Sequence, residues 1–336
     1  LSPYVAHRLI TEYEIIKEVL KKHPFQKVDK YIQEIFWRIY WKGWLELRPQ
    51  VWSDFVDDIK GFEEDEVYKK AVLGQTEIQC FNDWVKELKE YNYLHNHTRM
   101  WFASIWIFTL NLPWQKGAEF FMKYLFDGDA ASNTLSWRWV AGLQTKGKHY
   151  IAQAWNITKF TNNRYKNVKL NENALSKIDN RDYKIKALSI KKDNTKSDTL
   201  VLFENDLNIE SLNLKNYNQI FCFILSNEKR KIKIDDKVLA YKNALIKDQA
   251  KRYEKIKIID EKSFEEICNS TKKFDIIYPS VGENLSFLNN LRKKYSLSFN
   301  FLTRNGDEFC WQFSNKGFFN FKSNIPIILQ KLNLSF

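Results

Sequence analysis

The sequence predicts a mostly α-helical N-terminal half followed by a smaller α/β domain with a mostly parallel sheet. Apolar residues recur at helical spacing through residues 4–20 and 27–45. Residues 101–110 are apolar on nearly every side yet too few to cross a bilayer, so we expect them to form a buried core helix. From residue 199 onward, short apolar runs alternate with helical stretches, which is the pattern of parallel strands joined by crossover helices.

These patterns divide the 336 residues into three segments. We expect a helical domain over residues 1–165 and an α/β domain over residues 199–336, and each is long enough to bury a core of its own. Residues 166–198 are rich in Lys, Asn and Asp and lack a sustained apolar period, so they are interpreted as a linker.

Composition narrows the class of protein. The net charge of +12 favours a nucleic-acid partner, although most of the positive excess lies after residue 165. The 4 Cys are scattered without a CxxC pair, which indicates reduced thiols and argues against a disulfide framework or a metal site. The sequence contains no signal peptide or membrane-spanning stretch, so we expect a cytoplasmic monomer without membrane contact.

The helix expected over residues 27–45 places Glu34, Trp37 and Arg38 on one face, because these residues are spaced i, i+3 and i+4. In isolation, this pattern also fits an amphipathic helix with a surface ion pair and a Trp that packs in the core. At the start of the chain Ser2 precedes a Pro, a combination that commonly caps a helix.

Polar and aromatic residues flank the expected core helix on both sides. They are Asn96, Arg99 and Met100 before it, and Asp127, Asp129, Asn133 and Trp137 after it. Within each group the spacing puts side chains on one helical face, and the two Asp stand where the later helix should begin. This lining is unusual for a plain core, and it indicates a large, flat, aromatic ligand with polar edges.

In the last segment, apolar runs are expected as strands and the stretches between them as helices. The expected strands are 200–203, 220–225, 258–259, 274–278 and 298–302, and the expected helices are 238–256, 264–270 and 284–295. A Gly-rich phosphate loop is absent from the sequence, so a dinucleotide site is not supported. Residues 311–321 are expected to dock back as an aromatic tail, to which we assign no chemistry.

Three blocks together resemble the flavin-binding helical domain of the DNA photolyase and cryptochrome family, in its bacterial photolyase-like branch. They are His-Asn-x-x-Arg-Met at 95–100, Pro-Trp-Gln-x-Gly-Ala-Glu-x-Phe-Met at 113–122 and Asp-Gly-Asp-x-Ala-x-Asn-x-x-x-Trp-x-Trp at 127–139. Their shared order makes the match specific, whereas one block alone would be weak. The resemblance implies FAD as the cofactor and DNA containing pyrimidine dimers as the partner.

On this resemblance, the cofactor contacts can be assigned residue by residue. Leu1 and Ser2 resemble the end of the loop that wraps the flavin diphosphate, so the chain is expected to lack residues upstream of them. Asn133 matches the amide near flavin N5. Arg99 and Asp127 match a salt bridge beside the ring. The expected FAD contacts are Ser2, Arg38, Asn96, Arg99, Asp127, Asp129 and Asn133.

The resemblance also implies the substrate and the reaction. Side chains that match contacts to a cyclobutane pyrimidine dimer are Glu34, Trp37, Asn96, Met100 and Trp139. Excited reduced flavin would donate an electron to the dimer, which splits and returns the electron, as in a deoxyribodipyrimidine photolyase, a carbon–carbon lyase. The residues expected to take part in catalysis are Asn133, Trp137, Trp114 and Glu34. The chain departs from the family at His97, where Arg is commoner, and at Ile39, where Glu is usual.

In the family, flavin photoreduction runs through a chain of tryptophans. Trp137 matches the member next to the flavin and Trp114 the middle one, but the distal position falls near Phe62, where the sequence has no Trp. Either Trp52 or Trp106 completes the chain, or photoreduction is expected to be slow.

From the sequence alone, three functions stay open: a repair photolyase, a cryptochrome-like flavin photoreceptor that signals through a partner without repair, and a flavin-free DNA-binding protein. Residues 203–207 faintly resemble the first strand and turn of the photolyase antenna domain. The α/β domain is therefore either antenna-like, with an unknown chromophore, or a ligand-free interaction domain.

Overall fold

The structure is a computed structural model that describes residues 1–188, 190, 197–210 and 212–334. The chain forms two compact units, each of which is described by itself. The first unit comprises residues 1–51, 184–231 and 239–336, and the second comprises residues 52–183 and 232–238.

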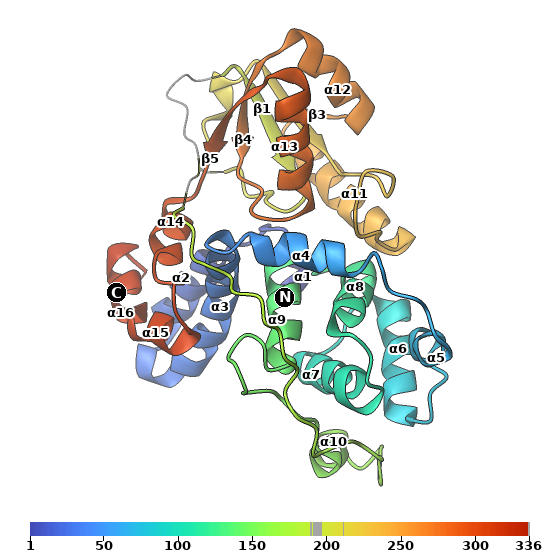
Figure 1. Cartoon of the computed structure of the whole chain (residues 1–336). Coiled ribbons are helices and arrows are strands. Elements are labelled where there is room, and N and C mark those ends of the chain that lie inside the picture. Colours follow the sequence, from blue (N-terminus) through green and yellow to red (C-terminus); the bar gives the residue numbers. More distant parts are fainter. Residues whose placement is uncertain (189, 191–196, 211, 335–336) are drawn as a thin grey trace. The chain divides into compact units, whose positions relative to one another are not determined.

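The first unit contains a five-stranded sheet with the strand order β3-β2-β1-β4-β5 (Figure 1). Its strands are β1 Thr199–Phe203, β2 Gln219–Phe223, β3 Ile256–Ile258, β4 Lys273–Ile277 and β5 Ser298–Leu302. All neighbouring strands are parallel, so the predicted α/β domain with a parallel sheet is confirmed. The chain winds outward from β1 in both directions, and the strand order reverses between β1 and β4.

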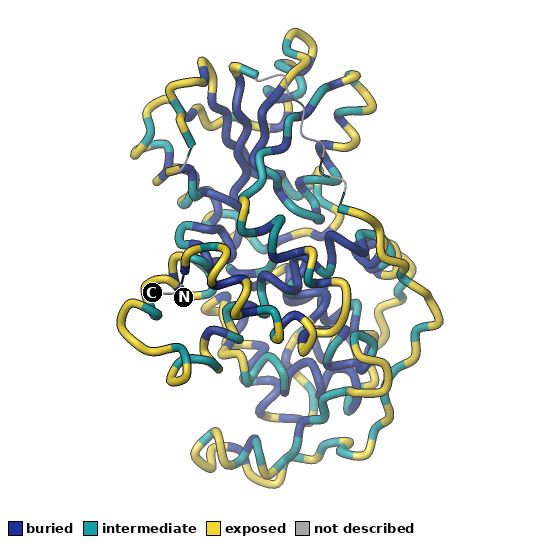
Figure 2. Tube along the Cα trace, turned by 90° about the vertical axis from the view of Figure 1, so that its left-hand side faces the viewer, coloured by how far each residue is buried: buried dark blue, intermediate teal, exposed yellow. Residues whose placement is uncertain are grey.

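Helices cover both faces of this sheet. They are α11 Asp236–Arg252, α12 Glu261–Ser270 and α13 Glu283–Tyr295. Val201 of β1 packs with Phe264 of α12 and Leu288 of α13, whereas Leu200 packs on the other face with Ile246 of α11. Successive strand residues therefore face opposite helical layers, and the three central strands β2, β1 and β4 are buried along most of their length (Figure 2).

Six further helices belong to the first unit. They are α1 Ser2–Ala6, α2 Glu12–Lys22, α3 Phe25–Glu46, α14 Asn305–Trp311, α15 Phe318–Ser323 and α16 Ile325–Lys331, with a short 3-10 turn, η2 Leu214–Asn216. Helix α3 packs against α2, α14 and α15. The close approach of α14 requires Gly43, where a Cβ would lie 2.6 Å from Cδ1 of Trp311.

The helical period predicted over residues 4–20 is interrupted, which corrects the sequence-based expectation. Arg8 adopts a φ of +50°, so the first helix ends after one turn. A second helix then begins at Thr11, whose side chain forms a capping box with Glu14. Ser2 lies inside the first turn rather than capping it, because the N-cap residue is Leu1.

The second unit is helical. Its elements are α4 Gln50–Asp58, which begins at its border with the first unit, α5 Glu66–Leu73, α6 Gln79–Tyr91, α7 Asn96–Ser104, the π-helix η1 Ile105–Thr109, α8 Trp114–Tyr124, α9 Ala130–Val140 and α10 Ala154–Phe160. Residues 101–108 are buried, as expected for a core helix. The change from α7 to a π-helix within this run was not visible in the sequence, and such turns often mark functional sites.

Residues 166–188 contain no helix or strand, but part of this stretch is held against the second unit. The backbone N–H of Lys177 donates to the carbonyl of Ala141 at 2.9 Å. Arg181 forms ion pairs with Asp58 at 2.8 Å and with Asp179 at 2.9 Å.

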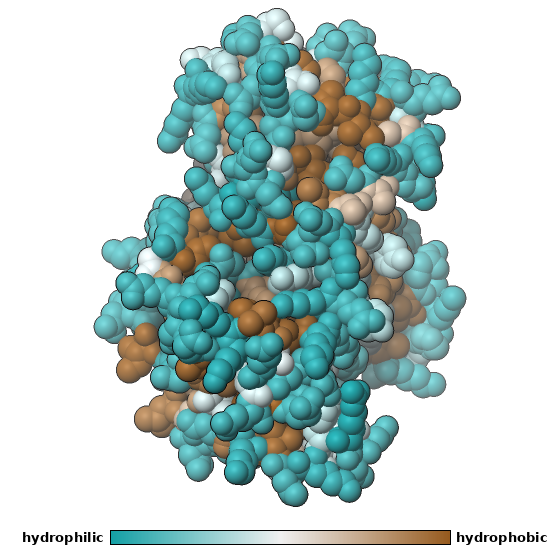
Figure 3. All heavy atoms as spheres, turned by 90° about the vertical axis from the view of Figure 1, so that its right-hand side faces the viewer, coloured by the Kyte–Doolittle hydropathy of each residue, from teal (hydrophilic) through white to brown (hydrophobic). Residues whose placement is uncertain are grey.

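The surface and the cysteines agree with the composition. Hydrophilic side chains predominate on the face drawn in Figure 3, and apolar side chains form scattered groups among them. Of the helices that the structure describes, none is both long and apolar enough to cross a membrane. The four cysteines are free and buried.

Candidate functional site

An ion pair joins the first sequence block to the third in the second unit. Arg99 of α7 donates from both Nη atoms to the two carboxylate oxygens of Asp127, at 3.0 and 2.9 Å. The Asp127 side chain is 1% exposed and the Arg99 side chain 22%. Arg99 Nε also donates to the carbonyl of Leu94 at 2.8 Å, which fixes the plane of the guanidinium. Paired bonds of this kind are short, directional and strong, so a cation is held in one orientation here.

A hydrogen bond joins the third block to the second. The side-chain amide of Asn133, on α9, donates from Nδ2 to the carbonyl of Ala118 in α8 at 2.8 Å. Asn133 is 8% exposed, so this bond fixes the orientation of its amide and leaves Oδ1 as an acceptor. Asp129 caps α9, because its Oδ1 accepts from the backbone N–H groups of Ala131 and Ser132 at 3.1 and 2.8 Å.

Trp137 lies one turn after Asn133 on α9 and is 2% exposed. Its six-membered ring rests on Gly117 of α8, where a Cβ would lie only 2.3 Å from Cη2. The indole N–H of Trp137 is buried and has no acceptor among the residues that the structure describes. Buried N–H groups normally have a partner, so an acceptor supplied by a ligand would complete this site. The amide of Asn133, the cation of Arg99 and this unsatisfied N–H fit the polar edge of a flavin.

Two sets of aromatic contacts involve the tryptophans expected in electron transfer. Trp106, from η1, lies 6.3 Å from Trp137 between ring centroids and donates its N–H to the carbonyl of Pro113 at 2.9 Å. Trp52 connects to Trp114 through Phe55, with centroid distances of 5.6 and 5.7 Å. Trp106 and Trp52 therefore stay as candidates for the missing member of the electron-transfer chain.

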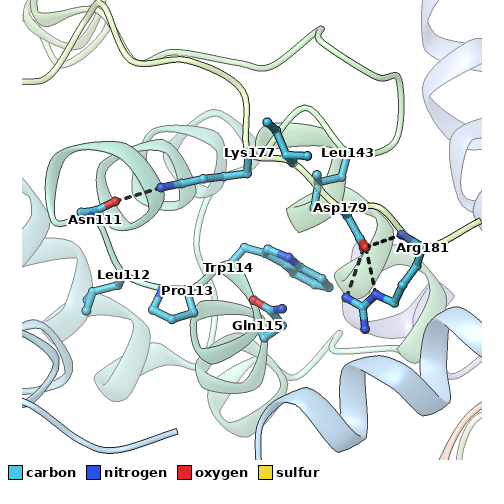
Figure 4. Close-up of a pocket in the computed structure, with 10 residues that line it drawn as sticks. Asn111, Leu112, Pro113, Trp114, Gln115, Leu143, Lys177, Asp179 and Arg181 are labelled. Carbon is cyan, nitrogen blue, oxygen red and sulfur yellow. Dashed lines mark hydrogen bonds and ion pairs between the residues drawn. The ribbon is translucent and has the colours of Figure 1, made fainter.

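Trp114 borders a cavity of about 310 Å³ (Figure 4). The Trp114 indole forms part of its wall, and the ion pair between Asp179 and Arg181 lies beside it. The guanidinium of Arg138 lies 5.7 Å from the Trp114 ring centroid. The remaining residues that line the cavity are Asn111, Leu112, Pro113, Gln115, Leu143, Lys177 and Ile178.

Three of the expected dimer contacts belong to the second unit. Asn96 is exposed at the first position of α7, and Met100 is half-buried one turn later. Trp139 is half-buried and stacks on Tyr150, with the ring centroids 5.9 Å apart. His97, which departs from the family pattern, stacks on the buried Trp101 ring. Burial lowers the pKa of the His97 imidazole.

The other two expected dimer contacts, Glu34 and Trp37, belong to the first unit, as do Ser2 and Arg38 from the expected FAD contacts. Glu34 is exposed, and Trp37 and Arg38 are half-buried on α3. The Trp37 indole is stacked on Phe318 of α15, with centroids 3.6 Å apart and planes 13° apart. Residues 311–321 were expected to dock back as an aromatic tail, and α14 and α15 do pack on α3, but the sequence did not indicate Trp37 as the partner of Phe318.

The place where a doubly wound sheet usually binds a ligand is the crevice at the carboxyl ends of the strands where their order reverses. Here charged side chains of the chain itself lie at the end of β1. Glu204 is 2% exposed and pairs with Lys242 and Arg230, each at 3.2 Å. Burial alone would raise the pKa of Glu204, but the two cations lower it to about 2. Arg8 donates to Asp307 at 2.9 Å close by.

At the end of β4, the buried carboxylate belongs to Glu46, the last residue of α3. Its carboxylate accepts from the Tyr278 hydroxyl at 2.7 Å and from the backbone N–H of Val281 at 2.8 Å. Burial raises the pKa of Glu46 to about 7. Carboxylates and cations of the chain thus stand where an anionic ligand would be held, which favours the ligand-free interpretation of the α/β domain. Among the residues described, no group of three or more His, Cys, Asp or Glu side chains is arranged to hold a metal ion.

Comparison with known proteins gives one family match. Residues 31–179 match the model described as FAD binding domain of DNA photolyase. Relatives named deoxyribodipyrimidine photo-lyase include those of Agrobacterium fabrum, 29% identical over 149 residues (42% of this chain and 31% of that protein), and of Thermus thermophilus, 29% identical over 158 residues (45% and 37%). That of Buchnera aphidicola subsp. Baizongia pistaciae is 26% identical over 163 residues (45% and 34%). The match spans about a third of the length of these relatives. No solved structure matches the chain.

Proposed function

We propose that the protein binds FAD and uses blue light to repair cyclobutane pyrimidine dimers in DNA, because residues 31–179 match the FAD binding domain of DNA photolyase and the relatives similar to this part of the chain are named deoxyribodipyrimidine photo-lyase. One observation carries this proposal above the others. The bidentate pair of Arg99 with Asp127 and the bond from Asn133 to the carbonyl of Ala118 join three separate sequence blocks at one place. An isolated ion pair or helix cap would not bring three separate sequence blocks together.

FAD would be held at its ring by residues of the second unit. Arg99 supplies a fixed positive charge beside the ring, which favours an electron-rich, negatively charged state, and Asp127 keeps that charge in position. Asn133 presents an acceptor oxygen because its amide nitrogen is already bonded. Asn96 and Asp129 are proposed as further contacts from the resemblance, as are Ser2 and Arg38 of the first unit. The chemistry that FAD supplies when bound is light absorption and the exchange of one electron with the dimer.

The chain itself would conduct electrons to the flavin, orient the substrate and exclude water from the tryptophans. Trp137 is close-packed and buried, so it can pass an electron inward without exposing its ring to water. Trp114, at the wall of a cavity, would reduce oxidised Trp137 and would be reduced in turn by an external reductant. Glu34 is proposed to donate or accept hydrogen bonds with the bases. Trp37 and Trp139 are proposed to stack on them, as enzymes that read flipped bases do.

A cryptochrome-like photoreceptor remains the second candidate, and one observation favours it. Phe318 covers one face of the Trp37 indole, so that face is closed to a base. A protein that signals through a partner would have no need of that face, whereas a repair enzyme must free it.

The cofactor part of the proposal is tested by the absorption spectrum of the purified full chain. We expect the bands of an oxidised or reduced flavin, either as purified or after reconstitution with FAD, and release of intact FAD on denaturation. Absence of flavin both in the purified protein and after reconstitution would refute the cofactor assignment and leave the flavin-free DNA-binding protein.

A further inference from the structure

The C-terminal aromatic segment lies against the helix that carries Trp37. Helix α15 begins directly after Gly317 and packs on α3, and both helices belong to the first unit. Phe318, the first residue of α15, is 7% exposed, and its ring is parallel to the Trp37 indole at a centroid distance of 3.6 Å. This is the arrangement of a base stacked on an aromatic side chain.

The other neighbours of the Trp37 indole have different orientations. Trp41 lies 5.0 Å away with its ring tilted by 40°, and Tyr40 meets the indole edge-on at 5.6 Å and 81°. Among these three neighbours only Phe318 is parallel to the indole. Its ring therefore covers one face of the indole, in the position that a stacked nucleobase would take on that face.

We propose that Phe318 holds the stacking place of a flipped base on Trp37, and that it must leave this place before DNA containing a pyrimidine dimer can bind. The inference rests on the proposed function, because it requires Trp37 to be a base-stacking residue. Replacement of Phe318 by a base on Trp37 would change the free energy of stacking little. Stacking between aromatic side chains and stacking of a base on an aromatic side chain contribute free energies of the same order. Phe318 is then an internal competitor that lowers the affinity for damaged DNA without contacting the cofactor.

The local structure allows Phe318 to move while the rest of α15 stays in place. A Cβ added at Gly317 would meet nothing within 4 Å, so the backbone before the helix is not packed in. Six residues are too few to form a stable helix alone, so α15 depends on its contacts with α3. Other contacts with α3 do not involve Phe318: the Phe321 ring lies 5.8 Å from Phe36 and 5.6 Å from Tyr40 between centroids, and the Tyr40 hydroxyl donates to the carbonyl of Lys316, just before α15, at 2.9 Å. Opening of the first turn of α15, with rotation of the Phe318 side chain, would therefore uncover Trp37.

The test compares two substitutions at Phe318 with one at its neighbour. Phe318→Leu keeps most of the apolar volume but has no flat ring, and Phe318→Ala removes both. Phe319→Ala is the matched control, because Phe319 is the next residue of the same helix and is 85% exposed. For each full-length protein, loaded with FAD and kept in the dark, the affinity is measured for an oligonucleotide with one thymine dimer and for the same oligonucleotide undamaged.

We expect Phe318→Leu and Phe318→Ala to bind the damaged oligonucleotide about three- to tenfold more tightly than wild type, since that range corresponds to the loss of one aromatic stack. Affinity for undamaged DNA should not change, and Phe319→Ala should behave as wild type. If wild type prefers damaged DNA but the Phe318 variants bind it equally or more weakly, the inference is wrong and the proposed function stands. If neither wild type nor the Phe318 variants prefer damaged DNA, the proposed function is wrong and the inference falls with it.

Hydrogen–deuterium exchange on the wild-type protein gives a result that does not depend on any variant folding. Damaged DNA should speed exchange of the amides in the first turn of α15, and undamaged DNA should leave them unchanged. Unchanged or slower exchange in the presence of damaged DNA, with binding demonstrated in the same sample, would overturn the inference.

Discussion

Gly117 is the position where one added methyl group should disturb the proposed site most directly. A Cβ there would lie 2.3 and 2.4 Å from two carbons of the Trp137 ring and 3.0 Å from Nε1 of Trp106. Both indoles are almost completely buried, at 2% and 0% exposure, and cannot swing out to solvent. Over-packing a core costs about 1–3 kcal/mol, and contacts this short belong at the upper end. Ala gains up to about 1 kcal/mol over Gly inside a helix, so Gly117→Ala should lower the free energy of unfolding by about 2 kcal/mol.

The assay is urea unfolding of Gly117→Ala beside Gly61→Ala, because a Cβ at Gly61 would meet nothing within 4 Å. The control should unfold within about 0.5 kcal/mol of wild type, as surface substitutions usually do. In protein loaded with FAD, Gly117→Ala should also slow photoreduction, since Trp137 would have to shift. If Gly117→Ala is as stable as the control and photoreduces at the wild-type rate, the packing of Trp137 against α8 described here is wrong.

Three further predictions concern electron transfer, damage recognition and pH. Trp137→Phe should slow flavin photoreduction at least about tenfold, a barrier increase of about 1.4 kcal/mol, while repair by chemically pre-reduced enzyme continues; unchanged photoreduction would exclude Trp137 from the chain. Trp37→Ala should weaken binding of dimer-containing DNA by about ten- to a hundredfold and leave binding of undamaged DNA unchanged, as titrations with a damaged and an undamaged oligonucleotide would show. Equal losses of affinity for the two oligonucleotides would mean that Trp37 does not recognise damage. Burial raises the pKa of Glu46 from its ordinary value of 4.5 to about 7. Between these two pH values the folded state holds a proton that the unfolded chain loses. The free energy of unfolding of the wild type should therefore fall by about 3 kcal/mol as pH rises through that window. Glu46→Gln should flatten this slope in urea unfolding between pH 5 and 8, and equal slopes in the two proteins would contradict the assignment.

Strands β1 and β2 could be predicted from sequence because most of their residues are buried and form continuous apolar runs. Val201 and Leu200 of β1, for example, face opposite helical layers, so both positions are apolar. The strand order could not be predicted in the same way, because it depends on pairings between distant segments. The break near Arg8 was missed although a signal was present: Thr11 and Glu14 have the spacing of a capping box.

The candidate site was predictable where a side chain meets another side chain of a recognisable block, as in the pair of Arg99 and Asp127. It was not predictable where the partner is backbone. The carbonyl of Ala118, which fixes the amide of Asn133, carries no sequence signal, because every residue offers the same acceptor. The stack of Phe318 on Trp37 joins segments from opposite ends of the chain, and only the tertiary fold brings them together.

Photorepair in a defined reaction tests the central claim most directly. The full chain, loaded with FAD and chemically reduced, is mixed with an oligonucleotide that carries one thymine dimer and is illuminated with blue light. We predict that the dimer is converted to two thymines in the light and stays intact in the dark and in protein without flavin. Protein that holds reduced FAD and binds the damaged oligonucleotide, yet leaves the dimer intact under illumination, would contradict the account and favour the photoreceptor.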